Sequence, residues 1–483
     1  MLFKNVVDFV ASGFRPRVCI VGTGPAGTSL ALRLQQRKIP CLLIEAGGYD
    51  YSETSQDFYR GEVVGDPYHR LHEARLRQFG GSSGHWSGWV SPLDASDFEV
   101  QQYMPNSGWP IRKADLDPYA VAADEILQVK PKAEDRPLTP DIDAIHYRFS
   151  PPVRFGTAYR ANVELSKTVG LLLNTTVKEL VPGNGHINSI KVVDGNRQER
   201  DLPVDQVCLC TGGIENSRLL LWSNARYQGG VVPGADTLGR YWMEHPVHAI
   251  ADAVTFNGFE MQFESWSQDK RFFAPSSLAK KAHAIGGAHI WMRAHSKERS
   301  KALNLLNEAI CVAPSLSNRL LKLANKEFRC GAEILSEFEQ VPLPQNRIEL
   351  GRETDVLGVP RVRLHWKKSE TERKSALIAA RLLGEALIRH DVGRLRTRNF
   401  LTDGMAWPSD DQKGGWHHMG GTRMAESPAT GIVDRNCKVF GMANLYVGGS
   451  SVFTTGGHAS PTYTIVQLAL RLGDHLATQL ARA

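Results

Sequence analysis

A glycine-rich segment near the start of the chain has the spacing of a nucleotide-binding turn. Gly22, Gly24 and Gly27 form G-x-G-x-x-G after an apolar run at 17–22 and before the helical pattern TSLALRLQQR. The first glycine permits a tight turn, the second lets a pyrophosphate approach the backbone, and the third packs helix on strand. The start of the helix then faces the phosphates, where its N–H groups and dipole favour negative charge. The pattern predicts a dinucleotide site.

An acidic residue and a second glycine-rich segment extend this prediction. Glu45 ends the next apolar run, CLLIEAG at 41–47, where its carboxylate can accept hydrogen bonds from ribose hydroxyls. An acid at this position disfavours the 2′-phosphate of NADP. The segment FGGSSGHWSGW at 79–89 is too rich in glycine for regular structure, so we predict a loop. Its many backbone N–H groups favour a bulky cofactor, FAD, over NAD.

Length and composition limit the classes of protein that the chain can represent. A chain of 483 residues is too long for one compact core, so we expect two domains. The net charge of +6 is mild for this length and argues against nucleic acid as a partner. The sequence has no apolar run of 18 residues, so we expect no transmembrane helix. The N-terminal segment lacks a signal-peptide pattern, and we expect a cytoplasmic protein.

The cysteines predict neither disulfides nor a metal site. The chain has seven, an odd number, and several lie inside apolar runs, as expected of buried free thiols in a reducing compartment. Cys208 and Cys210 have the spacing of neither a redox pair nor a zinc site, and alternation along one strand explains them. We expect no bound metal.

The remaining elements predict an α/β fold, α+β overall, with a discontinuous Rossmann-like domain for FAD. Strands are expected at 171–180 and 206–210, a hairpin turning at 194–196, and a helix from 215. A long helix should begin at the capping box formed by Ser369 and Glu372. We expect the FAD-binding domain at 1–100, 155–240 and 405–483, and a sheet-based substrate domain at 101–154 and 241–404. A cavity should lie at their junction.

Four segments, spread over nearly the whole chain, resemble the glucose–methanol–choline (GMC) family of flavin oxidoreductases. They are VGTGPAG…EAG, FGGSSGHWSGW, LGRYWMEHP at 238–246, and the C-terminal WHHMGGTRM…GIVDRNCKVFGMANLYVGGSSVF…HASPTYTIVQLAL. The resemblance implies FAD, a two-domain fold and oxidation of a CH–OH group to a carbonyl, with a hydride passing to flavin N5. The C-terminal motifs are most similar to the sugar-oxidase-like branch.

The resemblance also implies roles for particular residues. His417 opens an H-x-x-G-x-x-x-M segment, so it matches the histidine that faces flavin and substrate, and we predict that it is the catalytic base. Asn444–Gly449 match a strand running toward the flavin ring. His418 is expected to support the loop. The helix predicted from Pro461, with Ser460 as its N-cap, would direct N–H groups at negative charge on the flavin.

The second catalytic position departs from the family pattern. Where relatives carry a second histidine or an asparagine just before the last helix, this chain has Ser460, and His458 lies two residues earlier. We favour His458 as the partner of His417 and keep Ser460 as the alternative.

The cofactor-binding candidates combine the glycine motifs with positions implied by the resemblance. His85 lies where some sugar-oxidising members attach flavin covalently, although many relatives bind it without a bond, and both remain open. The full set is Gly22, Gly24, Gly27, Glu45, Ala46, Gly80, Gly81, Ser82, Ser83, His85, Trp86, Ser87, Val177, Gly449, Pro461 and Thr462.

The substrate follows from the sequence only by analogy. We expect a sugar, glycoside or polyol, for which Trp86, Trp89 and Trp416 would offer stacking surfaces. One alternative is a hydrophobic or natural-product alcohol. Another is a non-catalytic flavin-binding subunit that passes electrons to a cytochrome, against which His417 and the lack of a haem motif argue. The electron acceptor could be oxygen, a quinone or a redox protein.

Overall fold

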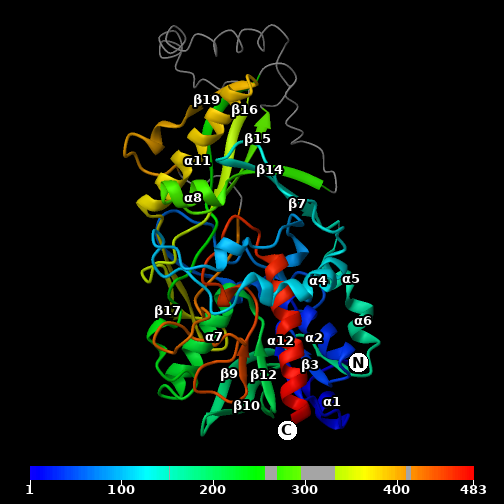
Figure 1. The fold of residues 1–483 in the computed structure, drawn as a ribbon. Helices are drawn as coiled ribbons and strands as arrows, with labels where there is room; N and C mark the ends of the chain where they lie inside the picture. Colours follow the sequence, from blue (N-terminus) through cyan, green and yellow to red (C-terminus); the bar gives the residue numbers. More distant parts are fainter. Residues whose placement is uncertain (152, 256–268, 295–331, 409–414, 483) are drawn as a thin grey trace.

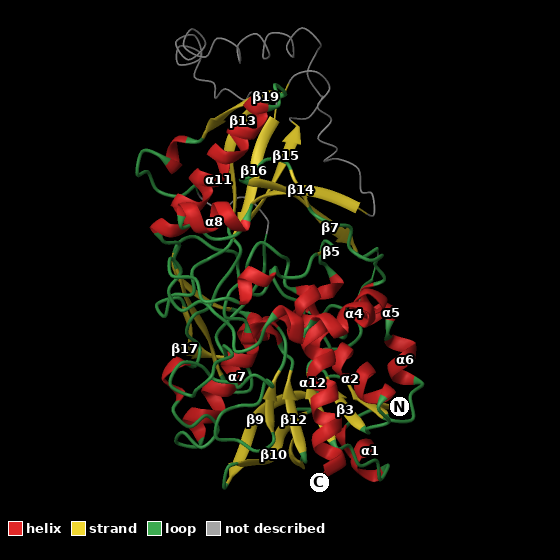
Figure 2. Ribbon diagram, viewed as in Figure 1, coloured by secondary structure: helices red, strands yellow, loops and turns green. Residues whose placement is uncertain are grey.

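The computed structural model describes residues 1–151, 153–255, 269–294, 332–408 and 415–482. Both termini lie in the same half of the molecule, among the elements coloured blue and red in Figure 1. A second half, built on another sheet, lies at the opposite end of that view, and Figure 2 shows loops filling the region between them. The mixed α/β fold class predicted from the sequence is confirmed.

The half that contains the termini is built on a parallel sheet. Within the described residues its strand order is β1-β8-β3-β2-β12-β20, and every adjacent pair is parallel. The strands are β1 (Leu2–Phe3), β2 (Val18–Val21), β3 (Cys41–Ile44), β8 (Val169–Leu172), β12 (Gln206–Leu209) and β20 (Leu445–Val447). Four of them, β2, β3, β8 and β20, are fully buried along their length, as is usual for strands covered on both faces. The sheet thus unites residues from both ends of the chain.

Helices pack against this sheet, and one of them directly follows its first glycine-rich turn. Helix α2 (Pro25–Gln36) follows β2 directly, and α12 (Thr462–Arg482) packs alongside it, where Arg33 and Asp474 lie 2.7 Å apart. The other helices are α1 (Val6–Ala11), α3 (Glu53–Gln56), α4 (Ala120–Leu127), α5 (Phe155–Ala158), α6 (Arg160–Glu164), α7 (Gly212–Arg226), α8 (Ser277–His283) and α11 (Glu370–Arg389). The strand–helix unit predicted around the first glycine motif is present.

The opposite half is a sheet crossed on one face by α11. Its strand order in the described residues is β19-β13-β16-β15-β14-β7-β5, with β6 paired to β7. The strands are β5 (Trp89–Val90), β6 (Arg136–Pro137), β7 (Ile142–Phe149), β13 (Val247–Thr255), β14 (Asp269–Pro275), β15 (Ala288–Ala294), β16 (Ala332–Phe338) and β19 (Gly393–Thr397). The predicted capping box of α11 is present, because Glu372 accepts from the backbone N–H of Ser369.

Three local expectations need correction. The stretch 171–180 is two strands, β8 and β9 (Thr176–Gly183), because Asn174 with φ of +50° turns the chain out of the parallel sheet. The loop at 79–89 contains one 3-10 turn at Gly81–Gly84 and enters β5. Helix α12 begins at Thr462, and the carbonyl of Pro461 accepts its first bond from Ile465, so Pro461 is the cap and not the first helical residue.

Two small sheets complete the fold. Strands β10 (His186–Val193) and β11 (Glu199–Pro203) form the predicted antiparallel hairpin, with its turn after Val193. Strand β9 pairs with the other edge of β10. Strands β17 (Arg347–Thr354) and β18 (Pro360–Trp366) pair with β4 (Gly61–Gly65). The cysteines of the described residues, Cys19, Cys41, Cys208, Cys210 and Cys437, are buried and free, as predicted, and Cys311 and Cys330 lie outside those residues.

Gly27 is where the first helix meets its strand most closely, which generates a stability prediction. A Cβ at Gly27 would lie 2.0 Å from the carbonyl oxygen of Gly22, so Gly27→Ala must push α2 away from β2. We expect a loss of about 3 kcal/mol, measured as a lower melting temperature. The matched control is Gly384→Ala in α11, whose new Cβ would meet Leu395 at an ordinary 3.5 Å. Equal melting temperatures for the two variants would contradict the tight packing.

Candidate active site

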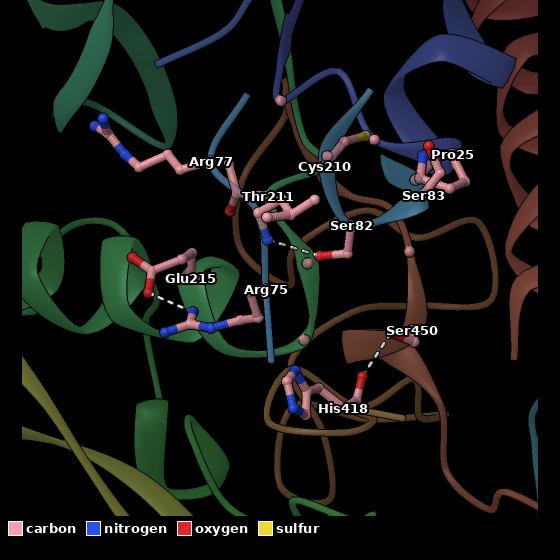
Figure 3. Close-up of a pocket in the computed structure, with 18 of the residues that line it drawn as sticks. Pro25, Arg75, Arg77, Ser82, Ser83, Cys210, Thr211, Glu215, His418 and Ser450 are labelled. Atoms are coloured by element: carbon pink, nitrogen blue, oxygen red, sulfur yellow. Dashed lines mark hydrogen bonds and ion pairs between the residues drawn. The ribbon is translucent and has the colours of Figure 1, made fainter. Parts of the chain in front are cut away.

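A cavity of about 440 Å³ lies where the glycine-rich turns converge. Its walls come from the first βα turn, the 79–89 loop, the start of α7, the segment 415–418 and the start of α12. Figure 3 shows side chains from several of these segments pointing toward a shared space. Of the predicted residues, those that line it are Gly22, Gly24, Glu45, Ala46, Gly81, Ser82, Ser83, His85, Trp86, Ser87, Val177, His417, Gly449, Ser460, Pro461 and Thr462.

The first βα turn is shaped by close backbone approaches. Gly22 has φ of +100°, and a Cβ there would lie 2.5 Å from the carbonyl oxygen of Cys210, the residue that follows the neighbouring strand β12. At Gly24 a Cβ would meet no atom within 4 Å, so this glycine borders open space. Gly27 is absent from the cavity wall and packs the helix instead. The three glycines therefore differ in role as the motif predicts: Gly22 makes the tight turn, Gly24 borders the cavity, and Gly27 packs helix on strand.

Glu45 is tied into the same turn. One carboxylate oxygen accepts from the backbone N–H of Thr23 at 3.1 Å, and the other accepts from Gly47 at 3.0 Å. Burial raises the pKa of Glu45, although the hydrogen bonds from Thr23 and Gly47 oppose that rise. The side chain is thus held rigidly at the end of β3 beside the cavity.

The 79–89 loop is fastened to the turn that it faces. The N–H of Gly80 donates to the Thr23 hydroxyl at 3.1 Å, and Gly80 lies behind the wall and not in it. The hydroxyl of Ser83 donates to the Gly80 carbonyl at 2.7 Å and accepts from the N–H of Phe155 at 3.0 Å. His85 packs against Trp416, with ring centroids 5.2 Å apart. Hydrogen bonds and ring packing therefore hold the 79–89 loop in place as one wall of the cavity.

The sequence analysis did not predict one part of the cavity wall, which is formed by Arg75, Arg77, Thr211 and Glu215. Arg75 and Glu215 form a buried pair at 2.7 Å that spans the cavity edge, and Arg77 and Thr211 lie close by (Figure 3). A signal was present, because CTGG follows a buried strand and opens a helix, like the first motif. The sequence around Arg75 and Arg77 gave no such signal, because nothing local distinguishes these two residues from surface arginines.

His417 lies in a buried cluster at the cavity wall. Its Nδ1 is 2.7 Å from Oε1 of Glu337 and 3.0 Å from Nδ1 of His245. Burial lowers the pKa of His417, but the Glu337 carboxylate outweighs it, so the pKa lies above its usual value. Burial alone would raise the pKa of Glu337, and His417 and His289 hold it well below the usual range. Burial lowers the pKa of His245.

A buried carboxylate positions both histidine-bearing segments. Glu244 Oε1 accepts from the backbone N–H of His245 at 2.8 Å and from that of His417 at 2.6 Å. Its other oxygen accepts from the Tyr68 hydroxyl. Burial raises the pKa of Glu244 to about 7, with His417 opposing.

His418 also lines the cavity, in a different environment. Its Nε2 is 3.1 Å from the Tyr68 oxygen. Because the Tyr68 proton is given to Glu244, this Nε2 donates and the lone pair lies on Nδ1. Burial and the nearby Arg75 lower the pKa of His418 well below its usual value, so the ring stays neutral.

Ser460 and His458 lie on different sides of their loop. Ser460 is part of the cavity wall, whereas His458 is not. The ring of His458 is 3% exposed and engaged at both nitrogens, by Asp94 at 3.2 Å and by the Tyr147 hydroxyl at 3.1 Å. Ser460 therefore lines the same cavity as His417, and His458 does not.

Comparisons with known proteins match the chain to named oxidoreductases. The family model for GMC oxidoreductases matches residues 342–469. A 2-methyl-1,2-propanediol dehydrogenase of Mycolicibacterium austroafricanum is 23% identical, covering 96% of this chain and 95% of its own length. The fructose dehydrogenase large subunit of Gluconobacter japonicus is 23% identical over 61% of this chain and 51% of its own.

A solved structure shares the fold. Pyridoxine 4-oxidase from Mesorbium loti superposes with a TM-score of 0.55, at 17% identity, over 97% of this chain and 100% of its own. The described helices include none that is both long and apolar enough to span a membrane. The chain is therefore an oxidoreductase whose residues 342–469 match the family model for GMC oxidoreductases.

Proposed function

We propose that the protein binds FAD in the 440 Å³ cavity and oxidises a sugar or polyol, with His417 accepting the hydroxyl proton. The observation that carries the proposal is the convergence of the dinucleotide turn and two histidines on one cavity. Gly24 borders open space at the N-terminus of α2, Glu45 stands at the end of β3, and the 79–89 loop lies against this turn and lines the same cavity. These residues fit an extended dinucleotide with an anionic centre.

The chain's own residues supply positioning and proton transfer. FAD, when bound, supplies the two-electron acceptor for the alcohol carbon. His417 has Nδ1 at Glu337, which leaves Nε2 for a substrate hydroxyl, and the raised pKa makes the neutral ring a stronger proton acceptor. Ser460 stands on the same cavity wall and can hydrogen-bond the substrate oxygen. Thr462 and Ile465 in the first turn of α12 line the cavity, and a helix N-terminus favours negative charge beside it.

The substrate class rests on the cavity wall and on the relatives. Trp86, Trp89 and Trp416 all line the cavity, and aromatic faces of this kind stack on polar rings. The matched relatives are named for a diol and for fructose. We therefore propose a vicinal diol, polyol or sugar as the donor.

Removing His417 tests the mechanism directly. His417→Ala should keep its yellow colour, because the ring is one wall residue among many, but alcohols should bleach it anaerobically about 10²–10⁴-fold more slowly. The measurement is stopped-flow absorbance of the flavin with a panel of polyols and sugars. His418→Asn is the comparison, since this neutral, cavity-lining ring is the second candidate for the base. A larger loss in His418→Asn than in His417→Ala would move the role to His418.

Ser460 and His458 should separate into rate and stability effects. Ser460→Ala should slow bleaching about 3- to 30-fold, the value of one hydrogen bond to the reacting oxygen. His458→Gln should instead lower the melting temperature, because it breaks a buried contact with Asp94 and Tyr147. Measuring both quantities on both variants decides between them. A slow His458→Gln protein with normal melting temperature would restore His458 as the partner.

A further inference from the structure

The ring of His418 presents one unpaired nitrogen to the cavity. His418 is 7% exposed and is part of the cavity wall. Its Nε2 lies 3.1 Å from the Tyr68 oxygen, whereas Nδ1 has no hydrogen-bond partner among the described residues. Nδ1 is not one of the described side-chain atoms that are both unpaired and sealed from solvent, so it is open. The open space beside His418 is the cavity.

A chain of hydrogen bonds fixes which nitrogen of His418 carries the proton. The Tyr68 hydroxyl donates to Oε2 of Glu244, so the Tyr68 oxygen accepts from Nε2–H of His418. The lone pair of the neutral ring therefore lies on Nδ1. Burial and then the charge of Arg75 lower the pKa of His418 well below its usual value. Nδ1 is thus a hydrogen-bond acceptor that does not become charged.

The surroundings of His418 hold the ring in place and leave Nδ1 unoccupied. The His418 carbonyl accepts from the Ser450 hydroxyl at 2.6 Å, and the ring packs on Trp242 with centroids 5.7 Å apart. The nearby Arg75 donates to Glu215 and to two backbone carbonyls, and not to Nδ1 (Figure 3). The acceptor is therefore oriented before any ligand binds, and a ligand in the cavity can supply its hydrogen-bond donor.

We propose that Nδ1 of His418 accepts a hydrogen bond from a second hydroxyl of the alcohol donor, so that diols, polyols and sugars react in preference to alcohols with one hydroxyl. This selection rests on the proposed function, in which His417 accepts the proton of the hydroxyl that is oxidised. The two rings are consecutive in the chain and line the same cavity. A donor with one hydroxyl gives that group to His417, which leaves Nδ1 of His418 without a partner.

The two rings differ in what they do with a hydroxyl. The raised pKa of His417 suits it to take a proton, whereas the lowered pKa of His418 suits it to accept a hydrogen bond and leave the proton on oxygen. When a bound donor excludes water, an acceptor that gains no hydrogen bond destabilises the complex. We expect this to slow alcohols with one hydroxyl roughly 10- to 100-fold.

The experiment compares donors that differ by one hydroxyl. Anaerobic bleaching of the flavin is measured with ethylene glycol against ethanol, 1,2-propanediol against 1-propanol, and D-glucose against 2-deoxy-D-glucose. The pH is 8, where Glu244, with its pKa of about 7, is largely ionised. In the wild type the richer member of at least one pair should react roughly 10- to 100-fold faster. His418→Leu should bring that ratio near one, and His418→Asn, whose amide oxygen restores an acceptor, should keep it.

A second variant tests the fixed proton position without changing the ring. Tyr68→Phe removes the oxygen that accepts from Nε2, so the proton can move to Nδ1 and the ratio should fall roughly threefold or more at unchanged flavin content. Tyr463→Phe is the matched control. Its buried hydroxyl donates to Asp124 at 2.8 Å and lies outside the cavity wall, so the ratio should not change.

Two results would contradict this role of His418. One is a ratio near one in the wild type, or a ratio that His418→Leu leaves unchanged, while the richer donors bleach both proteins. The other is a His418→Leu protein that has lost flavin but keeps its ratio and melting temperature, which would assign the acceptor to the cofactor. Both results leave the proposed function standing. A wild type that no alcohol bleaches contradicts the proposed function and this selection together.

Discussion

One buried carboxylate holds together the two segments that bring His245 and His417 to the cavity wall. Glu244 uses a single oxygen to accept backbone N–H bonds from His245 and His417, residues 172 apart in the chain. Without those donors this oxygen would be buried and unsatisfied, at a cost of several kcal/mol. The contact is also sterically tight, because a Cβ at Gly415 would lie 2.5 Å from the carbonyl oxygen of His245. The position of the cavity wall at 415–418 follows from this one group.

A second buried carboxylate accepts hydrogen bonds from loop backbone at the junction between the two large sheets. Glu339 is buried and accepts from the backbone N–H of Gly287 and of Gly457, both at 2.8 Å. Asp97 is fully buried and lies 3.2 Å from Lys280. Carboxylates that bind glycine-rich backbone leave no room for side chains in those loops. They therefore fix loops without regular structure as firmly as strand pairing would, and the cavity between the sheets keeps its shape.

The protonation states of the histidines follow from the same burial. Burial lowers the pKa of His418 and of His245, and at His245 it outweighs the contact of Nδ1 with Glu337 at 3.1 Å. At His417 the attraction of Glu337 outweighs burial, and the pKa is raised. Two neighbouring rings of the WHHM segment thus have opposite electrostatic character. Residue type and spacing could not distinguish them, since the difference comes from a strand 80 residues earlier in the chain.

The sequence by itself determined the local elements. The glycine turn, the apolar runs of the parallel strands, the α11 capping box and the hairpin are each marked by residues within about 30 positions of one another, and patterns of that range can be recognised in one sequence. The prediction of one strand at 171–180 was wrong, because Asn174, in the left-handed region, divides this apolar run between strands of two sheets. The predicted start of α12 was also wrong by one residue, because serine and proline are both ordinary near a helix cap.

Only the tertiary structure decided which side chains meet. Ser460 and His458 are two residues apart, yet one lines the cavity and the other turns to Asp94 and Tyr147, because loop direction depends on Glu339 holding Gly457. The cluster of His245, Glu337 and His417 requires the register of β13 against β16 and the clamp at Glu244. Such contacts are set by long-range packing, and no spacing in the sequence records them.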